Sequence, residues 1–202
     1  QMAALPDAAI APGEIGELHG AEDDYLRALA RRFDGLDLSG MKIALDTANG
    51  ATYRVAPEIM RRLGAEVTVV ADAPDGANIN EGCGSTHIEG LAALVQAGEF
   101  DAGFAFDGDG DRLLAVDASG RVLDGDELIA IAAVHVRREG RLPGEGVAVT
   151  VMTNFGFHNA MEEAGIAVEV TPVGDRHVLE ALLEKGWALG GEQSGHVIER
   201  GF

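Results

Sequence analysis

The chain has 202 residues, of which 34 are Asp or Glu and 15 are Lys or Arg, so its formal charge is −19. A composition of 47% hydrophobic and 24% charged residues is typical of a folded globular chain, with one large domain or two small ones. Nucleic-acid-binding proteins need a cationic face to displace counterions from phosphates, so this acidic chain argues against nucleic-acid partners and anionic membranes. No apolar run approaches the roughly 20 residues of a membrane span.

Two features of the chain bear on its location. The segment Gln1–Ala4 has no basic region and no long apolar run after it, so we expect no signal peptide. Cys83 is the only cysteine, which excludes an internal disulfide and a cysteine-based zinc site and fits a reducing compartment. We therefore expect a cytoplasmic protein. Since the chain starts with Gln and ends at Phe202 soon after a polar loop, we also expect a piece of a longer protein.

Hydrophobic periodicity predicts an α/β unit after an Ala/Pro/Gly-rich linker at residues 1–18. A helix is expected from Glu22 to before Gly35, and a helix with Pro57 in its first turns is expected to end at Gly64. Strands are expected at residues 41–46, 65–70, 102–106 and 113–116, and further helices at 88–97 and 128–136. This order makes an α/β fold with a strand–helix–strand unit.

The same pattern recurs about a hundred residues later, which predicts two tandem copies of one α/β unit. The second copy has strands at 146–151, 167–170 and 187–189, a helix ending at Gly165, and a helix at 178–183. We place the first domain at residues 19–140 and the second at 144–202. A glycine-rich polar loop follows the third strand of each copy. Because ligands gather at the carboxyl ends of strands, the two loops predict a cleft between the domains.

The first loop alternates Asp107, Asp109 and Asp111 with glycines. Three carboxylates repel one another at close range, but glycines let the backbone curl so that all three converge on one point. A hard divalent cation is the natural occupant, and Mg²⁺ is favoured over Ca²⁺ because only three protein ligands are evident. Arg112, directly beside them, would either clamp a phosphoryl oxygen or pair with a neighbouring Asp.

Other motifs with aspartates or glycines fit this chain less well. The EF-hand pattern fails because its sixth position is Arg112 and its twelfth is Ala118. A haloacid-dehalogenase loop, with Asp107 as nucleophile of a phosphatase, is a closer rival, although Asp111 stands where that family has Thr or Val. The segment at residues 82–87, Gly-Cys-Gly-Ser-Thr-His, is a near miss to a dinucleotide-binding glycine motif.

The second loop, at residues 191–196, reads Gly-Glu-Gln-Ser-Gly-His. Glu192 beside Ser194 suits paired sugar hydroxyls, and His196 is able to move a proton near neutral pH. The alternative is an ordinary strand-connecting loop. The segment Val-Gly-Asp-Arg at 173–176 is a third polar turn, in which Arg176 would hold a phosphate or pair with a carboxylate.

These segments resemble those of a known family. Residues 106–112 resemble the magnesium loop of the α-D-phosphohexomutases and residues 191–196 their sugar-binding loop. Residues 45–53 and 173–178 are similar to the bacterial phosphoglucosamine mutase branch. The resemblance covers about residues 18–198. It implies domain 2 and most of domain 3 of a four-domain enzyme, each with a mixed sheet and helices on both faces. The first and fourth domains would then be missing partners.

The resemblance also implies an activity. The family branch interconverts glucosamine 6-phosphate and glucosamine 1-phosphate through a bisphosphate intermediate, with a phosphoserine as donor, and so feeds UDP-N-acetylglucosamine and cell-wall synthesis. The three Asp residues would hold Mg²⁺. Arg112 and His196 would be catalytic, and the residues that bind the phosphorylated amino-hexose would be Glu192, Ser194, Gly174, Asp175 and Arg176.

The chain lacks several segments of the family, among them the Arg-rich phosphate-binding loop of the fourth domain and the last elements of the third domain. The family's phosphoserine segment, Thr-Ala-Ser-His-Asn-Pro, does not occur in these 202 residues, so we expect the chain alone to be inactive. Another phosphohexomutase, acting on mannose or glucose phosphates, and a non-catalytic module that binds metal and sugar phosphate remain as alternatives.

Overall fold

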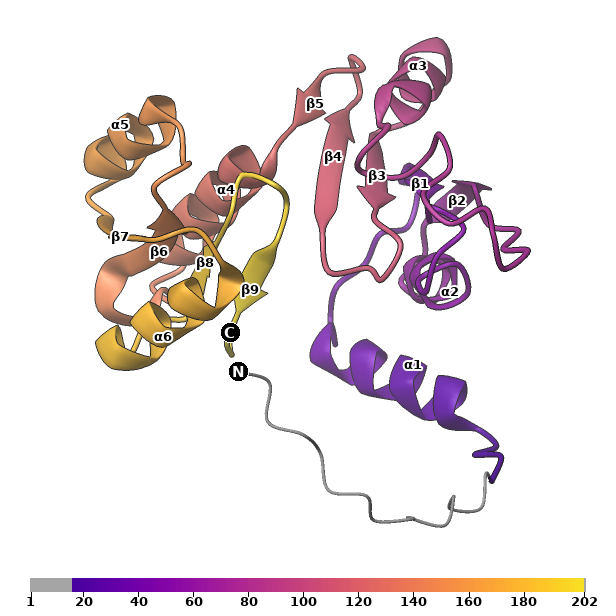
Figure 1. Ribbon diagram of the computed structural model, residues 1–202, viewed down its shortest axis with the longest axis horizontal. Coiled ribbons are helices and arrows are strands. Elements are labelled where there is room, and N and C mark those ends of the chain that lie inside the picture. Colours follow the sequence, from indigo (N-terminus) through magenta and orange to yellow (C-terminus); the bar gives the residue numbers. More distant parts are fainter. Residues whose placement is uncertain (1–15, 202) are drawn as a thin grey trace, which may run out of the picture.

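The computed structural model describes residues 16–201, which form two α/β units in tandem (Figure 1). Most of the expected linker at residues 1–18 lies outside the described residues. Within the described part, no helix is both long enough and apolar enough to span a membrane. The expected fold class, two α/β repeats each built on a mixed sheet, is confirmed.

The first unit is a five-stranded sheet in the order β2-β1-β3-β4-β5. Its strands are β1 (Lys42–Asp46), β2 (Glu66–Val70), β3 (Ala102–Phe106), β4 (Leu113–Asp117) and β5 (Val122–Leu123). The strand β1 pairs in parallel with β2 and β3, whereas β3–β4 and β4–β5 are antiparallel. Its helices are α1 (Ala21–Arg32), α2 (Val55–Arg62) and α3 (Glu89–Ala97).

Alternate residues of β1 face opposite sides of this sheet, because side chains in a strand alternate with a period of two. Ile43 and Leu45 pack with Ala56 of α2, whereas Ala44 packs with Leu91 and Val95 of α3. The two helices therefore lie on opposite faces. Helix α1 in turn packs against α2. This burial on both faces explains why β1 is an almost continuous apolar run.

The second unit repeats this plan with four strands in the order β7-β6-β8-β9. Its strands are β6 (Gly146–Thr150), β7 (Ala167–Thr171), β8 (Leu189–Gly191) and β9 (Val197–Glu199). Only the β8–β9 pair is antiparallel. Its helices are α4 (Gly125–Arg138), η1 (Pro143–Glu145), α5 (Phe155–Ala164) and α6 (Asp175–Lys185). Val178 and Leu182 of α6 pack with Ala148, on the face opposite to α4 and α5.

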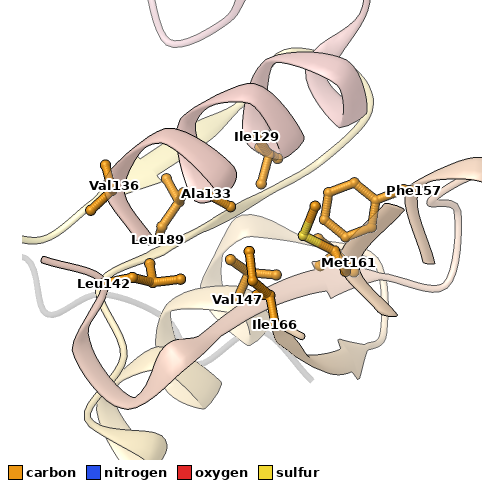
Figure 2. Close-up of a cluster of buried hydrophobic side chains, with 10 residues drawn as sticks. Ile129, Ala133, Val136, Leu142, Val147, Phe157, Met161, Ile166 and Leu189 are labelled. Carbon is orange, nitrogen blue, oxygen red and sulfur yellow. The ribbon is translucent and has the colours of Figure 1, made fainter. Parts of the chain in front are cut away.

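Helix α4 follows the first sheet along the chain but packs against the second. Figure 2 shows its apolar side chains facing strand β6 and helix α5, and the cluster joins Ile129, Ala133 and Val136 to Val147 and Leu189. The domain boundary that we expected between residues 140 and 144 stays a prediction, and the packing of α4 favours placing it before Gly125.

Several element bounds differ from those expected, each for a local reason. Helix α4 starts three residues earlier than expected, because Asp124 and Glu127 form a capping box in which each side chain accepts the other's backbone N–H. The third strand of the second unit includes Gly190, where the backbone runs so close to β6 that a Cβ would lie 2.3 Å from the carbonyl oxygen of Ala148. Helix α6 begins at Asp175, so the last two residues of the polar turn predicted at residues 173–176 belong to the first turn of this helix.

Candidate metal and sugar-phosphate site

The aspartate loop is the turn of the β3–β4 hairpin, at the carboxyl end of β3. The Asp107 carbonyl accepts the N–H of Gly110 at 3.2 Å, and its Oδ1 atom accepts the N–H groups of Gly110 and Arg112 at 3.1 and 3.2 Å. Gly110 has φ +76, a conformation that favours glycine. Asp107 is 9% exposed. The loop thus folds around a buried, hydrogen-bonded carboxylate.

The three carboxylates predicted to converge do so: one oxygen each of Asp107, Asp109 and Asp111 lies within 4.8 Å of the others. The pKa of Asp111 is raised, first by desolvation and then by a hydrogen bond and charge repulsion from Asp107, with a smaller contribution from Asp109. A bound cation would relieve this repulsion. Three carboxylate oxygens at this spacing are a donor set that fits a hard divalent ion such as Mg²⁺.

Arg112 lies beside the carboxylates with about half of its side chain exposed. Its Nε atom is 3.9 Å from Oδ2 of Asp107 and 3.9 Å from Oδ1 of Asp111. Both are long ion pairs at a partly exposed position, where such pairs contribute little stability. The guanidinium therefore remains able to meet an added anion, and both roles expected for Arg112 stay open.

The second loop is the turn of the β8–β9 hairpin, in the equivalent place of the second unit. The N–H of Glu192 donates to the carbonyl of His196 at 2.9 Å. The Oε1 atom of Glu192 accepts the N–H of Gly174 at 2.9 Å, which joins this loop to the segment before α6. The N–H of Gly125, at the start of α4, donates to the carbonyl of Gln193 at 2.9 Å.

The two loops touch each other directly. The N–H of Leu113 donates to the carbonyl of Gly195 at 3.0 Å, and a Cβ on Gly195 would lie 2.3 Å from the Leu113 carbonyl oxygen. The Nδ1 atom of His196 is 3.3 Å from Oδ2 of Asp111, and its Nε2 atom is 3.8 Å from Oδ2 of Asp175. The predicted metal, sugar and third polar segments therefore meet at one place. The cleft that we expected between the units stays a prediction.

Two of the expected site residues have exposed side chains that take no part in the contacts between the two loops. The Nε atom of Arg176 donates to Oε1 of Glu180 at 2.9 Å, one turn further along α6, and its side chain is 82% exposed. Ser194 is exposed on the second loop. Sequence reasoning missed the backbone contact between Leu113 and Gly195. The contact requires glycine at position 195, but a glycine in a loop does not show which distant segment it approaches.

Comparison with known proteins identifies the family. Residues 23–120 match the model described as phosphoglucomutase/phosphomannomutase α/β/α domain II, and residues 124–202 match domain III of the same family. The chain belongs to this phosphohexomutase family. Its two units are domains II and III, as the resemblance predicted.

The curated relatives compared with this chain are both phosphoglucosamine mutases. The chain is 53% identical over 196 residues to the phosphoglucosamine mutase of Desulforudis audaxviator, covering 96% of this chain and 43% of the relative. It is 58% identical over 186 residues to that of Rubrobacter xylanophilus, covering 92% and 40%. The chain is thus a phosphoglucosamine mutase homologue that spans about two fifths of the length of these curated relatives.

Solved structures agree on the fold. A phosphoglucomutase/phosphomannomutase family protein from Burkholderia thailandensis superposes with a TM-score of 0.77 at 27% identity, covering 88% of this chain and 39% of that one. An N-acetylglucosamine-phosphate mutase in its apo form gives a TM-score of 0.69 at 23% identity, covering 89% and 44%, which supports the fold alone.

Proposed function

We propose that this chain is the central part of a phosphoglucosamine mutase, which interconverts glucosamine 6-phosphate and glucosamine 1-phosphate by magnesium-dependent phosphoryl transfer. The observation that carries this proposal is the cluster of three carboxylates in direct contact with a Glu/Ser/His loop of the next domain. The names of relatives more than half identical to it supply the choice of sugar.

In this proposal, Asp107, Asp109 and Asp111 hold Mg²⁺. When bound, the ion neutralises charge on the phosphoryl group during its transfer. Arg112 then binds a phosphoryl oxygen, because its guanidinium lies beside the cluster and is only weakly paired. The two backbone N–H groups that hold Oδ1 of Asp107 leave its Oδ2 atom for the ion.

The second loop binds the sugar. Glu192 uses Oε1 to accept the Gly174 N–H, so its Oε2 atom is the one offered to a sugar hydroxyl, with Ser194 beside it. His196 is held between the carboxylates of Asp111 and Asp175, where it receives or returns a hydroxyl proton. We assign Gly174, Asp175 and Arg176 to contacts with the sugar or its phosphate. For Arg176 this requires release from Glu180.

A calorimetric titration with Mg²⁺ tests the metal assignment. Asp109→Asn removes one ligand, and we expect it to weaken Mg²⁺ binding at least about tenfold. The control is Asp34→Asn, which makes the same charge change at an exposed position on the loop after α1. Equal weakening in the two variants, or none in Asp109→Asn, would contradict a site at the aspartate loop.

A chimera tests the activity. We expect the chain alone to show no mutase turnover, because the phosphoserine segment of the family is not among its residues. Replacing the matching segment of the Desulforudis audaxviator relative by this chain should give an active mutase. Within that chimera, Asp109→Asn should abolish turnover and Asp34→Asn should not. A folded chimera that is equally active with and without Asp109 would refute the proposal.

A further inference from the structure

Asp46 is a buried carboxylate that the proposed function does not use. It is the last residue of β1 and is 3% exposed. Its Oδ1 atom accepts the N–H of Ala48 at 2.9 Å, and its Oδ2 atom accepts the N–H of Gly84 at 2.8 Å. A carboxylate withdrawn from water is unfavourable unless it is hydrogen-bonded, so each oxygen of Asp46 is matched to one backbone donor.

The two segments that Asp46 joins are the turn between β1 and α2 (residues 47–54) and the segment at residues 77–87. Both reach the aspartate loop. The N–H of Ala51 donates to the Gly108 carbonyl at 2.8 Å, and the N–H of Ser85 donates to the Phe106 carbonyl at 2.8 Å. These carbonyls lie on either side of Asp107 in the chain. The position of Asp107 is therefore fixed through two backbone bonds, one from each segment.

The two segments pack against the aspartate loop at close backbone contact. A Cβ on Gly50 would lie 2.2 Å from the Gly108 carbonyl oxygen, and a Cβ on Gly84 would lie 2.6 Å from that of Phe106. The segments are also bonded to each other, since the N–H of Asn80 donates to the Ala48 carbonyl at 2.9 Å. A shift of either segment must therefore displace the loop.

The backbone around Asp46 is strained. In the described chain, five residues other than glycine have positive φ, and four of them lie here: Ala48, Asn49, Ala71 and Asn80. Asn49 is held to the Ala71 carbonyl by its N–H at 2.6 Å. Such conformations persist only where the surrounding structure over-determines them, and they cluster at functional sites. Asp46 supplies such a constraint by binding the Ala48 N–H.

We infer that Asp46 is a positioning residue for the aspartate loop: it holds the two segments that place Asp107. This inference rests on the proposed function, in which Asp107 is a metal ligand. The second domain offers a comparison. Thr150 ends β6 at the place equivalent to Asp46, and its Oγ1 accepts the N–H of Met152 at 3.3 Å. In the second domain the β8–β9 loop carries no carboxylate cluster, and the neutral hydroxyl of Thr150 holds the turn after β6.

Amide hydrogen exchange tests the inference without any metal. Asp46→Thr keeps an acceptor for the Ala48 N–H and is too short to reach Gly84, while Asp46→Asn keeps the shape. In both variants we expect the Gly110 and Arg112 amides, which report on Asp107, to exchange about tenfold faster. The Ser119 amide, in the β4–β5 turn, should not change.

The control for a general loss of stability is Val95→Ala, which leaves a cavity in the hydrophobic core of the same domain. It should speed exchange through global unfolding, without selecting the aspartate loop. Unchanged exchange at Gly110 and Arg112 in both Asp46 variants, or the same pattern as in Val95→Ala, would overturn the positioning role.

Magnesium titration of the same variants separates the two proposals. We expect the Asp46 variants to bind Mg²⁺ roughly tenfold more weakly, as is usual when a group that orients a ligand is lost. If Asp109→Asn weakens binding and the Asp46 variants do not, the positioning role fails while the metal site stands. If Asp109→Asn has no effect, the metal site fails, and hydrogen exchange alone decides whether Asp46 positions the loop.

Discussion

Gly195 is the place where the contact between the two loops is most sensitive to substitution. It has φ +96, and a Cβ there would lie 2.3 Å from the Leu113 carbonyl oxygen, whereas real Cβ contacts are at least 3.0 Å. Gly195→Ala must therefore separate the loops. That movement stretches the Leu113 N–H bond to the Gly195 carbonyl, now 3.0 Å. The separation also moves His196 away from Asp111.

The expected cost has two parts. An alanine at positive φ costs roughly 1–2 kcal/mol. The clash with the backbone oxygen, and the bond that it weakens, adds about 1–3 kcal/mol. Gly76 is a matched control, because it has φ +92 and no atom beyond its two chain neighbours lies within 4 Å of the place that a Cβ would occupy. Gly76→Ala should therefore show the first cost without the second.

Urea denaturation followed by circular dichroism measures both variants. We expect Gly195→Ala to be less stable than Gly76→Ala by about 1–3 kcal/mol. The ring protons of His196 should shift in the NMR spectrum of Gly195→Ala alone, because the imidazole loses its neighbour Asp111. Equal destabilisation by the two alanines, with an unchanged His196 signal, would refute the loop contact.

Three further predictions concern buried groups. Burial raises the pKa of Asp126, so the folded chain holds the proton of this carboxyl group more tightly than the unfolded chain does. As the pH rises and Asp126 loses its proton, wild type should therefore lose stability relative to Asp126→Asn. Leu182→Ala should cost about 2–5 kcal/mol, because Leu182 is fully buried, as measured by urea denaturation. Burial, and then the charges of Asp46 and Glu81, raise the pKa of the Cys83 thiol, so iodoacetamide should alkylate it slowly at pH 8 and faster in Glu81→Gln.

Each of these has a control and a contrary result. Parallel profiles of stability against pH for wild type and Asp126→Asn would exclude a raised pKa at Asp126. Leu183→Ala, at a side chain 56% exposed, should cost less than about 0.5 kcal/mol, and a cost equal to that of Leu182→Ala would contradict the packing of α6. For Cys83, Glu58→Gln removes a charge that is not among those shifting the thiol pKa, and it should leave the alkylation rate unchanged. An alkylation rate in Glu81→Gln equal to that of wild type would contradict the effect of charge on this thiol.

The sequence predicted the first half of the site well because its signals are local. The run from Ala102 to Phe106 is a strand with the expected bounds, and the aspartates follow it directly. Convergence of Asp107, Asp109 and Asp111 follows from the glycines between them, so residue type and spacing were enough. The metal that this cluster would hold stays a prediction.

The second half was harder because its strand is short and made largely of glycine. The expected strand at 187–189 lies instead at Leu189–Gly191. It includes Gly190, where close approach to β6 leaves no room for a side chain, so the strand shows no hydrophobic pattern in the sequence. The return strand β9 was not expected at all. Its three residues, Val197–Glu199, are too few for a periodic pattern.

The contact between the loops was beyond sequence reasoning, but the path of the chain explains it. Leu113 and Gly125 stand at the two ends of one stretch that runs through β4 and β5 to the first turn of α4. Both of their N–H groups donate to the second loop, Leu113 to the Gly195 carbonyl and Gly125 to that of Gln193. Helix α4 is fixed in the core of the second domain, so this stretch is anchored at one end by packing and at the other by the aspartate hairpin. The placement of the two loops therefore depends on α4, and a substitution that loosens its first turn should disturb the site without touching a metal or sugar ligand.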